Sequence, residues 1–319
     1  MNHELRPRID SDVNWDFFVQ QIVNGLTLGS VYALIALGYT MVYGILKLLN
    51  FAHGEVYMFG AFAGFGVMTA LGGPASPAVP VATMIALMFL GGMLTSGVLA
   101  MALERFAYRR LRDAPRIAPL ITALGASFFL QASALTLFGA QFRSYDTYSY
   151  VDITGGIHWG PLNISSPRIL AILATIGLMI VLTFVVGRTR LGKAMRATSF
   201  DREAAAMMGI DTDRVIVATF AIGGILAGAA GVMFGLVYFS VFHLMGFTAG
   251  LKGFTAAVVG GIGSIPGAML GGLVIGLAEA FSAAYVSSTF QDLIVFAILI
   301  VVMLFRPTGL LGRADIKKV

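Results

Sequence analysis

The chain has 319 residues, of which 12% are charged and 58% apolar, and its mean hydropathy is +0.86. Soluble domains carry about 25% charged residues, so this chain has too few polar side chains to cover a soluble globule, and we predict an integral membrane protein. The sequence contains no cysteine, which excludes disulfides, thiolate metal sites and thiol catalysis.

Long apolar segments recur along the whole sequence and predict an all-α polytopic membrane protein. They are too continuous for the short alternating strands of a membrane barrel, and a spanning helix needs about 20 apolar residues. Glycine pairs four residues apart, such as Gly25 with Gly29 and Gly272 with Gly276, favour close helix packing. We predict eight or nine transmembrane helices with broken or re-entrant glycine-rich segments, at 17–46, 54–71, 79–103, 118–139, 169–187, 215–239, 268–286 and 290–305, with the short glycine-rich segment 247–262 as the ninth.

The positions of the basic residues predict how the chain is oriented. Of the 21 lysines and arginines, 15 lie at 105–116, 187–214 and 306–318, and the positive-inside rule assigns these regions to the cytoplasm. The net charge of +5 therefore reflects membrane orientation, and we expect lipid rather than nucleic acid around the chain. We divide it into a polar N-terminal segment at 1–16, a transmembrane domain at 17–305 that includes the cytoplasmic connection 187–214, and a cytoplasmic C-terminal tail at 306–319.

The connection 187–214 contains a sequence that predicts a short capped helix over 199–208. Thr198 and Asp201 have the spacing of an N-cap and its third helical residue, and Gly209 suits the left-handed residue that ends a helix. Ala204, Met207 and Met208 would form one apolar face. From these residues alone, the helix either lies on the lipid surface or docks into a cytoplasmic partner.

Three sequence stretches resemble one family of membrane permeases. The first has Glu203, Ala204 and Ala205 followed four residues later by Gly209, and is similar to the EAA loop with which ABC importer permeases dock on an ATPase subunit. The others, NFAHGE at 50–55 and GGIGSIPGA at 260–268, resemble the signatures of LivH-type permeases of bacterial branched-chain amino acid importers. The resemblance extends from about residue 17 to Gly312 and is weak at 72–80 and 141–168.

This resemblance implies a permease subunit in the bacterial inner membrane that imports leucine, isoleucine or valine by alternating access. It implies a LivM-like second permease, two cytoplasmic ATPase subunits that hydrolyse ATP, and a periplasmic amino acid binding protein. The chain itself would be no enzyme, with no catalytic residue, cofactor or metal. Two alternatives remain: a urea or short-amide permease of the same class, because such permeases share these signatures, and an ion-coupled secondary amino acid transporter. The residues assigned to ATPase coupling are Thr198, Asp201, Glu203, Ala204, Ala205, Met208 and Gly209.

Polar residues inside or beside apolar segments are candidates for the translocation pathway, because charges within a membrane are costly and are commonly functional. Asn50, His53 and Glu55 lie beside Gly54 where the first long apolar segment ends. They indicate either a broken helix that lines the substrate route or an interfacial loop capped by Asn50. The second glycine-rich sequence, with Gly261, Gly263 and Ser264, lies in the opposite half and is expected to face NFAHG across the core.

Two further charges lie alone in apolar segments of the second half. Lys252 and Glu279 are each the single charged residue of their segments, so we consider a buried ion pair between them, with a structural role. Glu279 is also the carboxylate on which an ion-coupled mechanism would depend.

Overall fold

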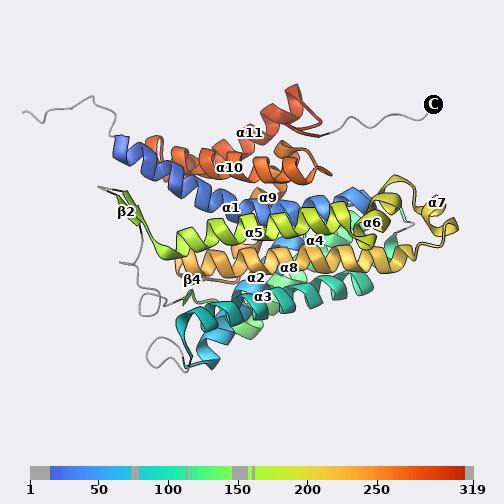
Figure 1. The fold of residues 1–319 in the computed structure, drawn as a ribbon, viewed down its shortest axis with the longest axis horizontal. Coiled ribbons are helices and arrows are strands. Elements are labelled where there is room, and N and C mark those ends of the chain that lie inside the picture. Colours follow the sequence, from blue (N-terminus) through green and yellow to red (C-terminus); the bar gives the residue numbers. More distant parts are fainter. Residues whose placement is uncertain are drawn as a thin grey trace, which may run out of the picture.

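The computed structural model describes residues 15–72, 79–112, 114–115, 117–145, 157–159 and 162–312. The chain forms a bundle of helices that run approximately along the long axis of the molecule (Figure 1). The first half comprises α1 (Trp15–Leu46), α2 (His53–Ala70), α3 (Val81–Leu103) and α4 (Ile117–Phe138), with η1 (Glu104–Tyr108) and η2 (Arg109–Leu111) continuing α3. The second half comprises α5 (Ser166–Arg188), α6 (Arg190–Phe200), α7 (Arg202–Met207), α8 (Thr212–Tyr238), α9 (Met245–Gly260), α10 (Ile265–Tyr285), η4 (Ser288–Phe290) and α11 (Gln291–Phe305).

Short antiparallel strands tie connections together at the end of the bundle where α8 finishes. β1 (Arg143–Ser144) pairs with β4 (Ser240–Val241), and β2 (Ile157–Trp159) pairs with β3 (Leu162–Ile164). All-α remains the right class, because each of these strands has only two or three residues.

Seven helices within the described ranges are long and apolar enough to cross a membrane. They are α1, α3 with its extension to Leu111, α4, α5, α8, α10, and α11 with η4. The remaining two apolar helices differ from these: α9 has only 16 residues, and α2 includes His53 and Glu55. The chain is thus a polytopic helical membrane protein as predicted, and the number of eight or nine crossings stays a prediction. Of the predicted terminal segments, 1–14 and 313–319 lie outside the described residues, while Trp15 and Asp16 belong to α1.

The core forms where glycines allow helices to approach closely. α1 packs along α10, and α8 packs against α1, α2 and α3. A Cβ atom on Gly276 would overlap the backbone of Gly29, and one on Gly272 would stand 2.5 Å from Ala33 Cα. These are the glycine pairs that the sequence marks for close packing. In contrast, α4, α5 and α11 bury few of their apolar side chains within the protein, which suits lipid or another membrane subunit.

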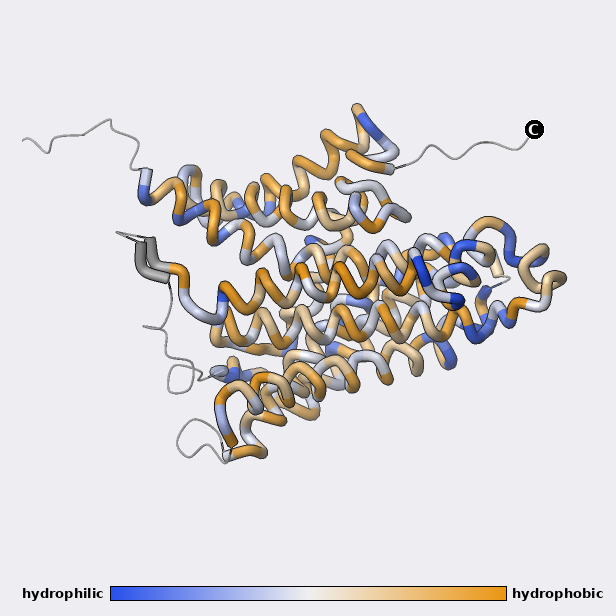
Figure 2. The backbone as a smooth tube through the Cα atoms, in the orientation of Figure 1, coloured by the Kyte–Doolittle hydropathy of each residue, from blue (hydrophilic) through white to orange (hydrophobic). Residues whose placement is uncertain are grey.

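Polar residues gather at one end of the bundle, where α6 and α7 extend beyond the long helices (Figure 2). The long helices themselves are mostly apolar along their length. This end contains the start of α8, η2 and the end of α5, each of which contributes arginines. We refer to it below as the α7 end.

Candidate functional site

The α7 end carries the segment that the sequence marks as a docking element, but its helices begin and end differently from the prediction. Asp201 is extended (φ −156°), separates α6 from α7 and caps α7, because its Oδ1 accepts a hydrogen bond of 3.0 Å from the Ala204 amide. The predicted N-cap Thr198 is wrong: it lies buried inside α6, which starts at its own cap, Thr189. The predicted single helix over 199–208 is therefore the end of one helix and a separate short one.

The end of α7 follows the prediction. Gly209 has φ +82°, its amide donates to the Ala206 carbonyl, and the Ile210 amide donates to the Ala205 carbonyl. This pair of hydrogen bonds around a left-handed residue is the Schellman arrangement, which glycine favours because it has no Cβ atom. The chain is thereby turned sharply from α7 toward α8.

Large apolar side chains protrude from this segment. Phe200 is 78% exposed, Met207 82% and Met208 83%, while Ala205 is buried beneath them. Glu203 and Ala204 are exposed on the same short helix. Exposed apolar groups outside the spanning helices are unfavourable in water, so this knob, defined by Phe200, Met207 and Met208, has the chemistry of a contact surface.

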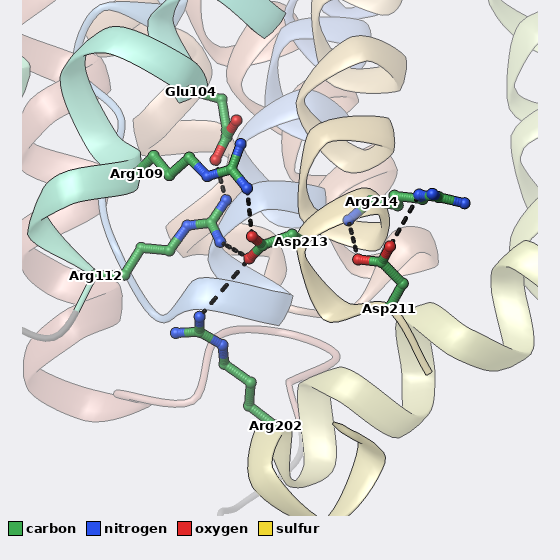
Figure 3. A network of polar contacts seen from close by, with 7 residues as sticks. All are labelled: Glu104, Arg109, Arg112, Arg202, Asp211, Asp213 and Arg214. Atoms are coloured by element: carbon green, nitrogen blue, oxygen red, sulfur yellow. Dashed lines mark hydrogen bonds and ion pairs between the residues drawn. The ribbon is translucent and has the colours of Figure 1, made fainter. Parts of the chain in front are cut away.

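A network of charged residues anchors the base of this segment (Figure 3). Asp213, in the first turn of α8, accepts hydrogen bonds from Arg109 of η2 and from Arg112, which follows η2, and Arg202 of α7 lies 3.9 Å from it. Arg112 also pairs with Glu104, and both of these side chains are buried. The network joins the extension of α3 to α8 and reaches α7.

This network is not among the sequence-based predictions, in which the arginines served only as markers of orientation and were not paired with Glu104 and Asp213. Arg109 lies in η2 and Arg112 three residues later, directly after η2, and Asp213 lies two residues after Asp211, which caps α8 through the Arg214 amide. These spacings were visible, but more than 100 residues separate the two partners, so the pairing could not be read from them.

The predicted pathway residues around NFAHGE are buried within the bundle, because α2 begins inside it. His53 contacts Gly38 of α1 and Gly223 of α8. Both glycines lie at least two helical turns from the nearer end of their helix, so His53 is well inside the bundle. Its ring lies 4.9 Å from that of Tyr39. Asn50 is also buried, and its Oδ1 accepts a 2.7 Å hydrogen bond from Tyr108. The start of α2 is therefore buried within the bundle, and a broken helix that lines the substrate route stays a prediction.

Glu55 and Gly54 connect α2 to two different helices. Glu55 Oε1 accepts hydrogen bonds from Ser127 (3.0 Å) and Gln131 (2.9 Å) of α4, and its other oxygen has no partner among the described residues. Gly54 lies against Gly246 and Gly250 of α9, so the two short helices cross there with their backbones in contact.

The second glycine-rich sequence lies elsewhere. Gly261 (φ +109°) and Gly263 (φ +93°) form the turn between α9 and α10, and Ser264 caps α10 by accepting a 3.2 Å hydrogen bond from the Gly267 amide. The turn packs against 308–312, where the Leu310 amide donates to the Val259 carbonyl. The expectation that it faces NFAHG is corrected, since the first turns of α9 occupy that position.

Lys252 and Glu279 are buried and belong to a larger cluster, whose third charged member, Asp292, is half exposed. Lys252 Nζ is 2.6 Å from Glu279 Oε1 and 2.7 Å from Asp292 Oδ1. Tyr32 donates a 2.9 Å hydrogen bond to the second oxygen of Glu279. The cluster joins α1, α9, α10 and α11. The sequence-based prediction paired Lys252 with Glu279 and did not include Asp292, which lies near the start of the predicted span 290–305. No group of three or more His, Asp or Glu side chains in the described ranges is arranged to hold a metal ion.

Together, these features define a class of protein: a multi-spanning membrane transport subunit with helix interruptions and buried charges in its core and a capped apolar knob outside it. Comparison with known proteins identifies the family. The family model for the permease component of the branched-chain amino acid transport system matches residues 21–303, and the chain belongs to this family.

Curated relatives agree over nearly the full length. The chain is 44% identical over 307 residues to the high-affinity branched-chain amino acid transport system permease protein BraD of Pseudomonas aeruginosa, covering 95% of this chain and 98% of BraD. It is 43% identical over 307 residues to LivH of Escherichia coli, with the same coverage. It is also 27% identical over 326 residues to LivM of Escherichia coli, covering 94% of this chain and 72% of LivM.

Proposed function

We propose that this chain is a permease subunit of an ATP-driven importer and that it translocates branched-chain amino acids by alternating access. The observation that carries the proposal is the near full-length similarity to BraD and LivH, which are permease proteins of high-affinity branched-chain amino acid transport systems. The signature stretches that first indicated this family lie at the α2 interruption, at the α9–α10 turn and at α7.

In this proposal α7 couples the permease to an ATPase subunit, which hydrolyses the ATP. The exposed knob of Phe200, Met207 and Met208 supports this role, because it offers about one helical turn of apolar surface outside the spanning helices. The Schellman turn at Gly209 and the cap at Asp201 hold its two ends, and Asp213 ties it to the bundle. The arginines around it favour a cytoplasmic location for the α7 end, and with it for the end of α11.

The assembly would contain a second, LivM-like permease, two ATPase subunits and a periplasmic amino acid binding protein in the bacterial inner membrane. Similarity of this chain to both LivH and LivM supports pairing between two related permeases. The exposed apolar faces of α4, α5 and α11 provide surface for the partner and for lipid.

The translocation route would pass the helix interruption at Asn50, His53, Gly54 and Glu55. A helix that begins inside the membrane presents its first amides and nearby polar side chains to the interior, as in other transporters with broken helices. Gly261, Gly263 and Ser264 form a separate turn on the α7 side of α9, where they would hinge α9 and α10 against the C-terminal segment.

The test is uptake by the complete complex in proteoliposomes, with the binding protein outside and ATP inside. We expect ATP-dependent uptake of labelled leucine that unlabelled isoleucine and valine inhibit. Uptake of urea or short amides with no leucine uptake would instead support the related permease class. Uptake by the permease subunits alone, driven by an ion gradient, would support a secondary transporter.

A further inference from the structure

A cavity of about 490 Å³ is lined by residues of α1, α2, α5, α8, α9, α10 and the start of α11. It lies toward the end of the bundle opposite the α7 end, where α1 begins and α8 finishes (Figure 1). Its volume is within the usual range for small-molecule sites, about 300–1,000 Å³. Part of its wall is apolar, with Leu28, Phe234, Val237 and Met245, and part is charged.

The charged part of the wall combines two separate groups of opposite sign. At one side lie Lys252 and Glu279, and Asp292 on the far side of Lys252 gives this cluster one more carboxylate than cations. At another side lies Arg168, which donates to Asn24 (2.7 Å) and has no ion pair with any acidic residue of the described ranges. A net negative cluster on the cavity, together with a cation that has no acidic partner among the described residues, is complementary to a molecule that carries both charges.

Tyr57 supplies an independent indication of a ligand. Its side chain lines the cavity and is 0% exposed, yet its hydroxyl has no hydrogen-bond partner among the described residues. Buried hydroxyl groups are nearly always hydrogen-bonded, and an unpartnered one beside a cavity is a group that a bound polar molecule would satisfy.

We propose that this cavity binds a zwitterionic α-amino acid with an apolar side chain. The ammonium group would lie at the Glu279 cluster and the carboxylate at Arg168, with Tyr57 bonded to one of them and the side chain against Phe234 and Val237. This inference rests on the proposed function and makes the cavity the position that receives the amino acid from outside. It differs from the helix interruption at Asn50–Glu55, which lies deeper in the bundle.

The experiment uses the absence of cysteine from this chain. In the reconstituted complex without binding protein, Ala283→Cys places one thiol on the cavity wall, and its reaction with a membrane-impermeant maleimide is followed on the band of this chain. We expect saturating leucine to slow the labelling severalfold. Ser288→Cys, exposed just beyond α10 and outside the cavity lining, serves as control and should label at the same rate with and without leucine.

Two analogues test recognition of both charges. 4-Methylpentanoate lacks the ammonium group and 3-methylbutylamine lacks the carboxylate, and neither should protect Ala283→Cys at the concentrations at which leucine does. Protection by either analogue equal to that by leucine would contradict a zwitterion site.

Tyr57→Phe tests the hydroxyl alone. We expect it to raise the half-protecting leucine concentration and the KM for uptake by about fivefold, which corresponds to about 1 kcal/mol and to one ordinary hydrogen bond. Tyr145→Phe, a second buried tyrosine outside the cavity, should change neither value. If the wild-type complex transports leucine while leucine fails to protect Ala283→Cys, or Tyr57→Phe behaves as wild type, the cavity proposal is wrong and the transport function stands. Absence of ATP-dependent uptake in the wild-type complex would refute the proposed function itself.

Discussion

A Cβ atom on Gly54 of α2 would stand 2.7 Å from the Cα atom of Gly250 on α9. The two helices that are too short or too polar to count among the seven apolar spans thus meet each other, backbone against backbone, in the middle of the protein. A side chain at this crossing must push apart two helices whose other contacts are already fixed by α1 and α8.

Gly54→Ala should therefore be destabilising although alanine is the better helix former. Overpacking of a tight core contact costs about 1–3 kcal/mol, and we expect a lower midpoint of thermal unfolding in detergent together with loss of uptake. Gly66→Ala is the matched control on the same helix, because no atom lies within 4 Å of its added Cβ. Equal behaviour of the two variants would contradict the close crossing.

Met207→Asp should disconnect the permease from its ATPase. A carboxylate on the exposed knob would have to be desolvated in an apolar interface, so co-purification of the ATPase and uptake should both fall by more than tenfold, about 1.4 kcal/mol or more. Membrane insertion and thermal stability should remain as in the wild type. Lys193→Asp, an exposed position on α6, is the control. Normal ATPase binding by Met207→Asp would remove α7 from the interface.

Asp213→Asn should loosen the connection between η2 and α8. Asp213 is partly exposed, so its ion pairs are weakened by solvent, and we expect a loss of about 1 kcal/mol, seen as a fall of about 2–4 °C in the unfolding midpoint. Asp211→Asn, two residues earlier, keeps a capping oxygen and loses only an exposed pair with Arg214, and should unfold as the wild type does. A larger effect from Asp211→Asn would show that its ion pair with Arg214, and not the arginine network around Asp213, stabilises this end.

Lys252→Met should be among the most damaging single substitutions in the second half. It leaves the buried Glu279 without its cation, and removing one partner of a buried pair costs about 3–5 kcal/mol. The double variant Lys252→Met/Glu279→Gln should recover part of this loss, because the glutamine is neutral and still accepts from Tyr32. Expression and thermal stability of the two variants measure the difference. No recovery in the double variant would mean that Lys252 acts through Asp292 instead.

Glu55 offers a test that separates transport from coupling. Glu55→Ala removes the acceptor of both Ser127 and Gln131 and should lower the rate of uptake while the ATPase still co-purifies. Glu55→Gln keeps one acceptor oxygen on the side chain and should retain α4 in place and more of the uptake. Loss of the ATPase from Glu55→Ala would assign the residue to coupling.

The sequence by itself determined the features that depend on neighbouring residues. Hydropathy located the seven helices of the described ranges that are long and apolar enough to span a membrane, together with α2 and α9. The glycine pairs marked the α1–α10 contact and Gly209 marked the end of α7, because apolar spans, close backbone contacts and left-handed residues each require particular residue types in the local sequence. The Thr198 cap was the local error: Thr189 caps α6 at the Gly192 amide and Asp201 caps α7 at the Ala204 amide, and a capping motif does not say which candidate starts a helix.

Only the tertiary structure decided which distant groups meet. Asp213 and Arg109 are 104 residues apart, Tyr32 and Glu279 are 247 apart, and Gly54 meets α9 rather than the α9–α10 turn. The sequence does not specify which charges or glycines become partners, because any cation attracts any carboxylate and any glycine allows another backbone to approach closely. The partner is selected by the tilt and register of whole helices, which the packing of α1, α8 and α10 sets cooperatively.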